Sequence, residues 1–185
     1  MTATLVLGGA RSGKSRFAQG EAQACGLPVT LIATAQALDA EMAARIARHR
    51  AGRAERWRTV EEPLDVAQAL AREAAPGQAV VVDCLTLWLS NLMHAGRDPD
   101  RESERLAAAL AVLSGEIWLV SNEVGLGLVP DTALGRAFRD AQGWLNQRLA
   151  AICPRVVFVA AGLPLVLKNE RPAPAPPFDR SARAP

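Results

Sequence analysis

The segment "GGARSGKS", residues 8–15, has the residue types and spacing of a phosphate-binding loop. It fits the pattern G-x-x-x-x-G-K-[S/T] between an apolar run and a helix-like segment, the context that this pattern requires. Gly8 and Gly13 allow backbone conformations in which successive N–H groups converge on phosphate oxygens, and the following helix adds the positive end of its dipole. In such a loop Lys14 reaches the β- and γ-phosphates, and the Ser15 hydroxyl ligates Mg²⁺. The segment therefore predicts a nucleotide-binding site.

A phosphate-binding loop also needs an acid at the end of a neighbouring strand to position the magnesium. The run "AVVVDC" places Asp83 directly after apolar residues, which predicts this role; the alternative is a turn or a helix N-cap before "LTLWLSNL". Asn122 and Glu123 follow another apolar run, in "LVSNEVGLGLVP". Ligands of open α/β sheets gather at the carboxyl ends of strands, so both are candidates by placement, and an ordinary loop role stays equally open.

A second candidate for phosphate chemistry is His49, in "RIARHRAGR". An apolar stripe at four-residue spacing predicts a helix before it, formed by Leu38, Met42 and Ile46. His49 falls beside this stripe and is expected to point toward the body of the protein. One interpretation is a structural histidine at a helix C-terminus, among solvated arginines. The other is a neutral imidazole that attacks phosphorus, with the arginines holding a polyphosphate. His94 has no comparable basic surroundings and is expected to be structural.

The elements that must position these residues alternate along the chain. Nearly continuous apolar runs, typical of strands covered on both faces, occupy residues 3–9, 28–34, 78–84, 116–122 and 154–162. Segments of helical length separate them, which favours βαβ crossovers. The sequence predicts an α/β fold with a doubly wound, mainly parallel sheet, in the three-layer P-loop NTPase (RecA-like) architecture. Residues 56–63 are a candidate for a further short strand, and 163–167 for an antiparallel edge strand.

Composition indicates one ordinary globular domain. The 185 residues are 50% hydrophobic and 22% charged, and the net charge of +2 gives no argument for nucleic acid or a membrane surface. Residues 1–170 are expected to form a single nucleotide-binding catalytic domain, and the Pro/Ala-rich residues 171–185 a flexible tail. The three cysteines form no C-x-x-C and suggest neither a disulfide framework nor zinc. With no secretory signal and no run able to span a bilayer, a cytoplasmic location is expected.

Taken together, these motifs are similar to those of a known family. "GGARSGKS", "IATAQALDAEMAARIARHRAGRAERWRTVEEP", the strand ending in Asp83, "SNEVGLGLVP" and "NQRLA" occur in the same order and spacing. Over about residues 4–168 the chain resembles the bifunctional adenosylcobinamide kinase / adenosylcobinamide-phosphate guanylyltransferase of cobalamin biosynthesis. The combination of "RIxxHRxxR…WxTxEEP" with "NEVGxGxVP" carries most of the specificity.

The resemblance implies two activities. A kinase step phosphorylates the aminopropanol hydroxyl of adenosylcobinamide with ATP or GTP. A guanylyltransferase step then takes GMP from GTP through a GMP–histidine intermediate to adenosylcobinamide phosphate, giving adenosyl-GDP-cobinamide and pyrophosphate. The partners implied are these nucleotides, Mg²⁺ and the corrinoid substrates, with no nucleic acid and no membrane span, and the family implies a homotrimer.

The resemblance also assigns site residues. The guanylylated histidine of the family corresponds to His49, and the metal ligands to Ser15 and Asp83. The implied nucleotide contacts are Gly8, Gly9, Ala10, Arg11, Ser12, Gly13, Lys14, Ser15, Ala33, Thr34, Ala35, Arg50, Ala51, Gly52, Arg53, Glu61 and Asp83. Two other functions are compatible with the phosphate-binding loop: a small-molecule kinase without guanylyl transfer, and a non-catalytic nucleotide-binding module. Loss of one of the two family activities is also compatible with the sequence.

Overall fold

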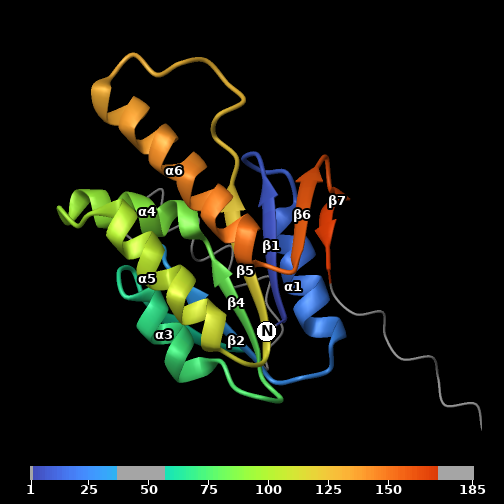
Figure 1. The fold of residues 1–185 in the computed structure, drawn as a ribbon. Helices are drawn as coiled ribbons and strands as arrows, with labels where there is room; N and C mark the ends of the chain where they lie inside the picture. The colour runs from blue at the N-terminus through green and yellow to red at the C-terminus, as the bar shows by residue number, and fades with distance from the viewer. Residues whose placement is uncertain (1, 37–56, 171–185) are drawn as a thin grey trace, which may run out of the picture.

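The computed structural model describes residues 2–36 and 57–170, which form one seven-stranded sheet with helices on both faces (Figure 1). The strand order is β3-β2-β4-β5-β1-β6-β7, and all neighbours are parallel except β6 and β7. The strands are β1 (Thr2–Gly8), β2 (Val29–Ala33), β3 (Arg58–Glu61), β4 (Ala79–Asp83), β5 (Glu116–Asn122), β6 (Arg155–Ala160) and β7 (Leu163–Asn169). The predicted mainly parallel sheet is confirmed, including the short strand within 56–63 and the antiparallel edge strand.

The described helices divide unequally between the two faces of the sheet (Figure 1). On one face, α1 (Lys14–Ala24) packs Ala18 and Ala22 against β-strand residues such as Val81 and Trp118. The other face carries α3 (Val66–Glu73), α4 (Leu85–His94), α5 (Pro99–Val112) and α6 (Ala133–Ile152). This arrangement is the three-layer architecture that the alternating pattern predicted.

The central strands are apolar at nearly every position because both of their faces are covered. In β4, Val80 and Val82 pack with the helices of one face, while Val81 packs with α1 on the other. All three side chains are fully buried. Alternation along the strand therefore places Asp83 on the α1 side, where the loop between β1 and α1 lies.

The hairpin β6–β7, which comes from the C-terminal part of the domain, lies beside the loop between β1 and α1 and supports it. Ala161 and Gly162 form its two-residue turn, and both have positive φ (51° and 80°), as in a type I′ turn. The Gly162 N–H donates to the Ser12 carbonyl at 2.8 Å. The turn thereby fixes one carbonyl of the phosphate-binding segment.

Two sequence predictions fall outside the described residues: the helix that carries His49, within 37–56, and the tail 171–185. The single-domain boundary at residue 170 stays a prediction for the same reason. Among the helices of the described ranges, none has both the length and the apolar character that a membrane crossing requires.

Candidate active site

The phosphate-binding segment lies between the carboxyl end of β1 and the start of α1. Gly13 is the N-cap of α1 with a φ of 97°, and a Cβ there would lie 3.1 Å from the Gly162 Cα, so glycine suits both the conformation and the space. Its carbonyl accepts from the Phe17 N–H at 2.9 Å, which starts the helix. Lys14 is buried, and its ammonium donates to the Gly9 carbonyl at 3.1 Å. Ala10 and Arg11 are exposed between these anchored ends.

Ser15 and Asp83, the two residues predicted to ligate magnesium, are in contact on the α1 side of the sheet. The Ser15 hydroxyl donates to a carboxylate oxygen of Asp83 at 3.2 Å. A hydroxyl and a carboxylate are hard oxygen ligands, and Mg²⁺ in nucleotide sites takes one or two carboxylates and completes its shell with phosphate oxygens and water. The pair therefore fits magnesium beside a bound nucleotide. The alternative role of Asp83 as a helix cap is not what the structure shows, because Cys84 is the N-cap of α4 and no side chain caps that helix.

The strand register brings the other predicted residues to the same edge of the sheet. Ala33 at the end of β2 pairs with Glu61 of β3 on one side and with Asp83 of β4 on the other. Gly8 pairs with Asn122 of β5. The carboxyl ends of five adjacent strands thus collect these residues at one edge, where open α/β sheets bind their ligands.

Thr34 and Cys84 join β2 to β4 at that edge. The Thr34 hydroxyl donates to the Cys84 carbonyl at 2.7 Å and accepts from the Cys84 N–H at 2.9 Å. Thr34 is fully buried, so its side chain holds the backbone that follows Asp83. Burial, and to a lesser extent the negative charge of Asp83, together raise the pKa of the Cys84 thiol to about 11. Cys84 is therefore a neutral packing group beside the acid.

Two polar residues of this region were not singled out from the sequence. The Asn91 side chain in α4 donates to the carbonyls of Thr34 (2.8 Å) and Pro63 (3.1 Å), and so ties the β2 and β3 ends to α4. The Thr86 hydroxyl accepts from the Asn122 N–H at 2.8 Å. A signal existed for both residues, since Thr86 and Asn91 are polar positions inside the mainly apolar helix segment "LTLWLSNL".

Glu123, a candidate by placement, directs its side chain into its own loop. One of its carboxylate oxygens accepts from the Gly125 N–H at 2.6 Å, and its own N–H donates to the Gly8 carbonyl at 3.1 Å. Its backbone therefore continues the pairing of β5 with β1 next to the phosphate-binding segment. His49, Arg50, Ala51, Gly52 and Arg53 lie outside the described residues.

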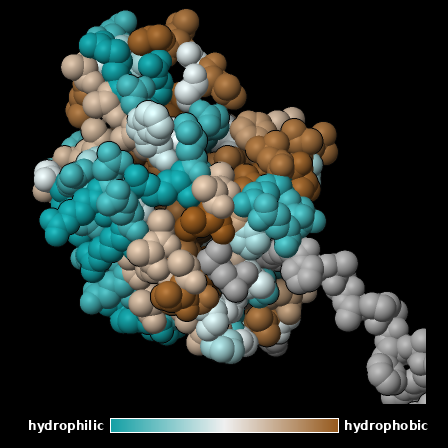
Figure 2. Space-filling model, viewed as in Figure 1, coloured by the Kyte–Doolittle hydropathy of each residue, from teal (hydrophilic) through white to brown (hydrophobic). Residues whose placement is uncertain are grey.

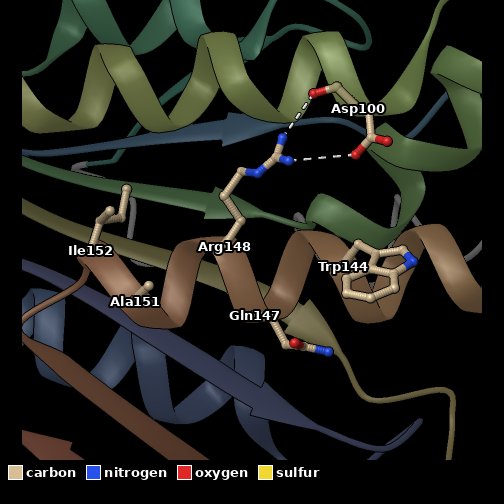
Figure 3. A pocket seen from close by; sticks show the side chains of 6 residues that line it. All are labelled: Asp100, Trp144, Gln147, Arg148, Ala151 and Ile152. Carbon is tan, nitrogen blue, oxygen red and sulfur yellow. Dashed lines mark hydrogen bonds and ion pairs between the residues drawn. The ribbon is translucent and has the colours of Figure 1, made fainter.

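A separate surface pocket lies between α5 and α6 (Figure 3), and none of its lining residues is among those predicted for the nucleotide site. Its lining includes Trp144, Arg148 and Asp100. The Arg148 guanidinium donates to the Asp100 carbonyl at 3.0 Å and lies 3.6 Å from its carboxylate. Because Arg148 of α6 is paired with Asp100 of α5, we interpret this cluster as an interaction that joins the two helices.

Comparison with known proteins shows which family the chain resembles. Residues 4–167 match the family model described as cobinamide kinase / cobinamide phosphate guanyltransferase. A Pseudomonas aeruginosa protein named "Bifunctional adenosylcobalamin biosynthesis protein CobP" is 55% identical over 169 residues, covering 90% of this chain and 97% of that protein. The Salmonella typhimurium protein named "Bifunctional adenosylcobalamin biosynthesis protein CobU" is 42% identical, covering 89% and 98%.

Solved structures share the fold at low sequence identity. A Pyrococcus horikoshii protein has a TM-score of 0.53 at 11% identity, covering 92% of this chain and 87% of that chain. An ATPase from a bacterial type III secretion system has a TM-score of 0.53 at 10% identity, covering 89% and 56%. One of these two proteins is an ATPase, and at such low identity the similarity concerns the fold alone.

Proposed function

Because the chain belongs to the cobinamide kinase / cobinamide phosphate guanyltransferase family, we propose that it carries out two successive transfers to a corrinoid. It phosphorylates adenosylcobinamide with ATP or GTP, and it then transfers GMP from GTP to adenosylcobinamide phosphate. The observation that carries the proposal is the contact of Ser15 with Asp83 beside the buried Lys14, within a chain that matches the family over residues 4–167. These side chains have the chemistry that nucleotide phosphates and a divalent cation need.

In the kinase step, the γ-phosphoryl group moves to the aminopropanol hydroxyl of the corrinoid. The backbone N–H groups of residues 8–15 and the Lys14 ammonium hold the phosphates and offset the charge that spreads over the phosphoryl oxygens. Ser15 and Asp83 hold Mg²⁺, which when bound neutralises phosphate charge and orients the nucleotide. Ala33, Thr34, Ala35 and Glu61 complete the nucleotide site from the ends of β2 and β3.

In the guanylyl step, a ring nitrogen of His49 attacks the α-phosphorus of GTP. A P–N bond forms, and the bond from phosphorus to the pyrophosphate oxygen breaks. A phosphate oxygen of adenosylcobinamide phosphate then attacks the same phosphorus and releases His49. Arg50 and Arg53, with the backbone of Ala51 and Gly52, contact the nucleotide phosphates. The covalent intermediate divides one transfer between two bulky substrates into two displacements.

A labelling experiment tests the role of His49. The protein is incubated with Mg²⁺ and α-labelled GTP, denatured, and examined for label that is acid-labile and base-stable, as expected of a phosphoramidate. His49→Ala is expected to abolish the label and leave phosphorylation of adenosylcobinamide largely intact. The matched control is His94→Ala, because His94 is the other histidine of the chain and lies in the last turn of α4, and this variant is expected to keep the label. Label that persists in His49→Ala would refute the assignment.

The pH dependence gives a second readout of the same step. His49 must be unprotonated to attack, so the rate of GMP incorporation is expected to fall as the pH drops through the ordinary histidine pKa of about 6.5. A rate that stays flat from about pH 8 to about pH 5 would contradict a histidine nucleophile.

Lys14→Ala is expected to suppress the kinase step, and it weakens labelling as well if both steps use one GTP site.

A further inference from the structure

The Asn91 carboxamide joins two points of the chain between which the segment with His49 is inserted. Its nitrogen donates to the Thr34 carbonyl at 2.8 Å and to the Pro63 carbonyl at 3.1 Å. Thr34 follows the last residue of β2, and Pro63 comes shortly after the end of β3. In the sequence, His49 belongs to the connection between these two points. One side chain of α4 therefore bridges the start and the end of that connection.

The backbone pairing of β2 with β3 stops before this bridge. The two strands pair in parallel as far as Ala33 and Glu61, and the Glu62 N–H adds one bond to the Ala33 carbonyl at 2.9 Å. Proline has no backbone N–H, so the pairing cannot continue through Pro63. Beyond the strands, the side chain of Asn91 joins the two chain ends in place of the sheet ladder.

The partners of Asn91 determine how its carboxamide is oriented. Both partners are carbonyl oxygens, which only accept hydrogen bonds, so the nitrogen and not the oxygen must face them. The two hydrogens of one amide nitrogen serve the two carbonyls. A carboxylate of the same shape would place further acceptors there, and an apolar side chain would leave both carbonyls without this donor. The position therefore uses the chemistry of asparagine and not merely its size.

Thr34 is itself fixed to β4, so the bridge also relates the connection to the acid. The Thr34 N–H donates to the Asp83 carbonyl at 3.3 Å, and its hydroxyl exchanges two hydrogen bonds with the backbone of Cys84. Thr34 is fully buried. Asn91 therefore holds Pro63 in a defined place relative to the strand end that carries Asp83.

A second residue of α4 holds only the chain that follows β3. Trp88 lies one helical turn before Asn91, on the same face of the helix. Its indole N–H donates to the Leu64 carbonyl at 2.7 Å. This bond anchors the chain after β3 to α4, whereas the two bonds of Asn91 join that chain to the end of β2. Trp88 is thus a matched comparison for Asn91.

We propose that Asn91 is a positioning residue for the guanylyl step, in which a ring nitrogen of His49 bonds to the α-phosphorus of GTP and pyrophosphate leaves. By joining the two ends of the connection that carries His49, it holds the nucleophile where it can attack. A misplacement of about 1 Å caused by a remote mutation can cost about 100-fold in rate. The kinase step uses Lys14, Ser15 and Asp83, whose side chains are not partners of the Asn91 carboxamide. The inference rests on the proposed guanylyl transfer and adds a residue that supports it.

The test compares two rates for each variant at saturating GTP. One is single-turnover incorporation of GMP into the protein from α-labelled GTP, and the other is transfer of label from γ-labelled GTP to adenosylcobinamide. Asn91→Leu removes both donors at similar size. It is expected to slow GMP incorporation about 10- to 100-fold and the kinase step by less than about threefold. Trp88→Phe removes one anchor from the same helix face and is expected to keep both rates within about threefold of wild type.

The possible outcomes separate this inference from the proposed function. If wild-type protein incorporates no GMP, the proposed guanylyl step fails, and the role of Asn91 fails with it. If wild type incorporates GMP and Asn91→Leu does so equally fast, or loses both activities in parallel, the role of Asn91 is overturned while the function stands. An equal loss of GMP incorporation in Trp88→Phe would also overturn it, because general loosening of α4 would then explain the effect. Thermal unfolding checks the folding of each variant, and Asn91→Ala replaces Asn91→Leu if the latter does not fold.

Discussion

The Cys84 thiol lies one residue after Asp83, the acid proposed for the nucleotide site, and its ionisation is suppressed. Its pKa is raised to about 11, first by burial and then by the charge of Asp83. Only the thiolate is a nucleophile, so the unreactive neutral thiol predominates near neutral pH. Cys84 is therefore expected to resist oxidation and alkylation although it directly follows Asp83.

Thiol titration of the native protein tests this protection. At about pH 8 a single thiol is expected to react rapidly with a disulfide reagent, because Cys25 is exposed, Cys153 is buried, and Cys84 is protonated. The Cys84 reaction is expected to speed up only as the pH rises toward about 11. Cys25→Ser should remove the rapid phase, and a rapid phase that survives in this variant would show that Cys84 is accessible and ionised.

Single residues of the site could be predicted where the signal is local. Lys14 and Ser15 belong to a contiguous motif, and Asp83 follows an apolar run directly, so the two residues that form the Ser15–Asp83 contact were singled out from the sequence, while their role as magnesium ligands stays a prediction. Asn91 was missed, because its role arises from hydrogen bonds to residues 57 and 28 positions away in the chain. Such contacts leave no spacing pattern in one sequence.

At the level of secondary structure, the fold requires glycine at some positions, whereas at others a larger residue would fit. Gly115, just before β5, has a φ of 98°, and a Cβ there would lie 2.5 Å from the Ala75 carbonyl oxygen. Gly20 lies inside α1, and a Cβ there would meet nothing within 4 Å. The same substitution should therefore have opposite effects at the two sites.

Gly20→Ala is expected to stabilise the protein by about 0.4–1 kcal/mol, because alanine has the higher helix propensity and restricts the unfolded chain. Gly115→Ala is expected to destabilise it by about 2 kcal/mol or more, through backbone overlap and positive φ. Thermal unfolding measures both, with shifts of about 2–4 °C per kcal/mol for a chain of this size. A neutral Gly115→Ala would show that the turn before β5 rearranges at little cost.

The central strands were predictable because they are covered on both faces, so their sequences are nearly continuous runs of apolar residues. The edge strand β7 was assigned from "LPLVL", although Leu163, Leu165 and Leu167 are largely exposed. The division of helices between the two faces was not predictable, since the amphipathic pattern of a helix does not say which face of the sheet it covers. That division depends on the crossovers, which are a property of the assembled sheet.

Across the whole molecule, apolar surface gathers on β7 and on the loop before α6 (Figure 2). Leu163 is 72% exposed and Leu128 is 96% exposed. Apolar surface on an edge strand favours association, because the strand also presents unpaired backbone groups. This surface supports the proposal, implied by the family, that the protein forms a trimer.

Light scattering after size exclusion tests the trimer. The expected mass is about three times the 19.6 kDa of the chain, independent of Mg²⁺ and nucleotide. Replacing Leu163 and Leu165 of β7 with serine is expected to lower the mass if this surface forms the interface, with Val112→Ser as a control at an exposed site on α5. A wild-type mass equal to one chain would contradict the proposal.

The hydrogen bond from the Gly162 N–H to the Ser12 carbonyl has a consequence for how the protein is made. The phosphate-binding segment is synthesised before the turn that supports it, which belongs to the last hairpin of the described domain. The ~150 residues between them take roughly 8 to 30 seconds to synthesise at about 5–20 residues per second. A nascent chain is thus expected to lack this support for the phosphate-binding segment until the β6–β7 hairpin has been synthesised.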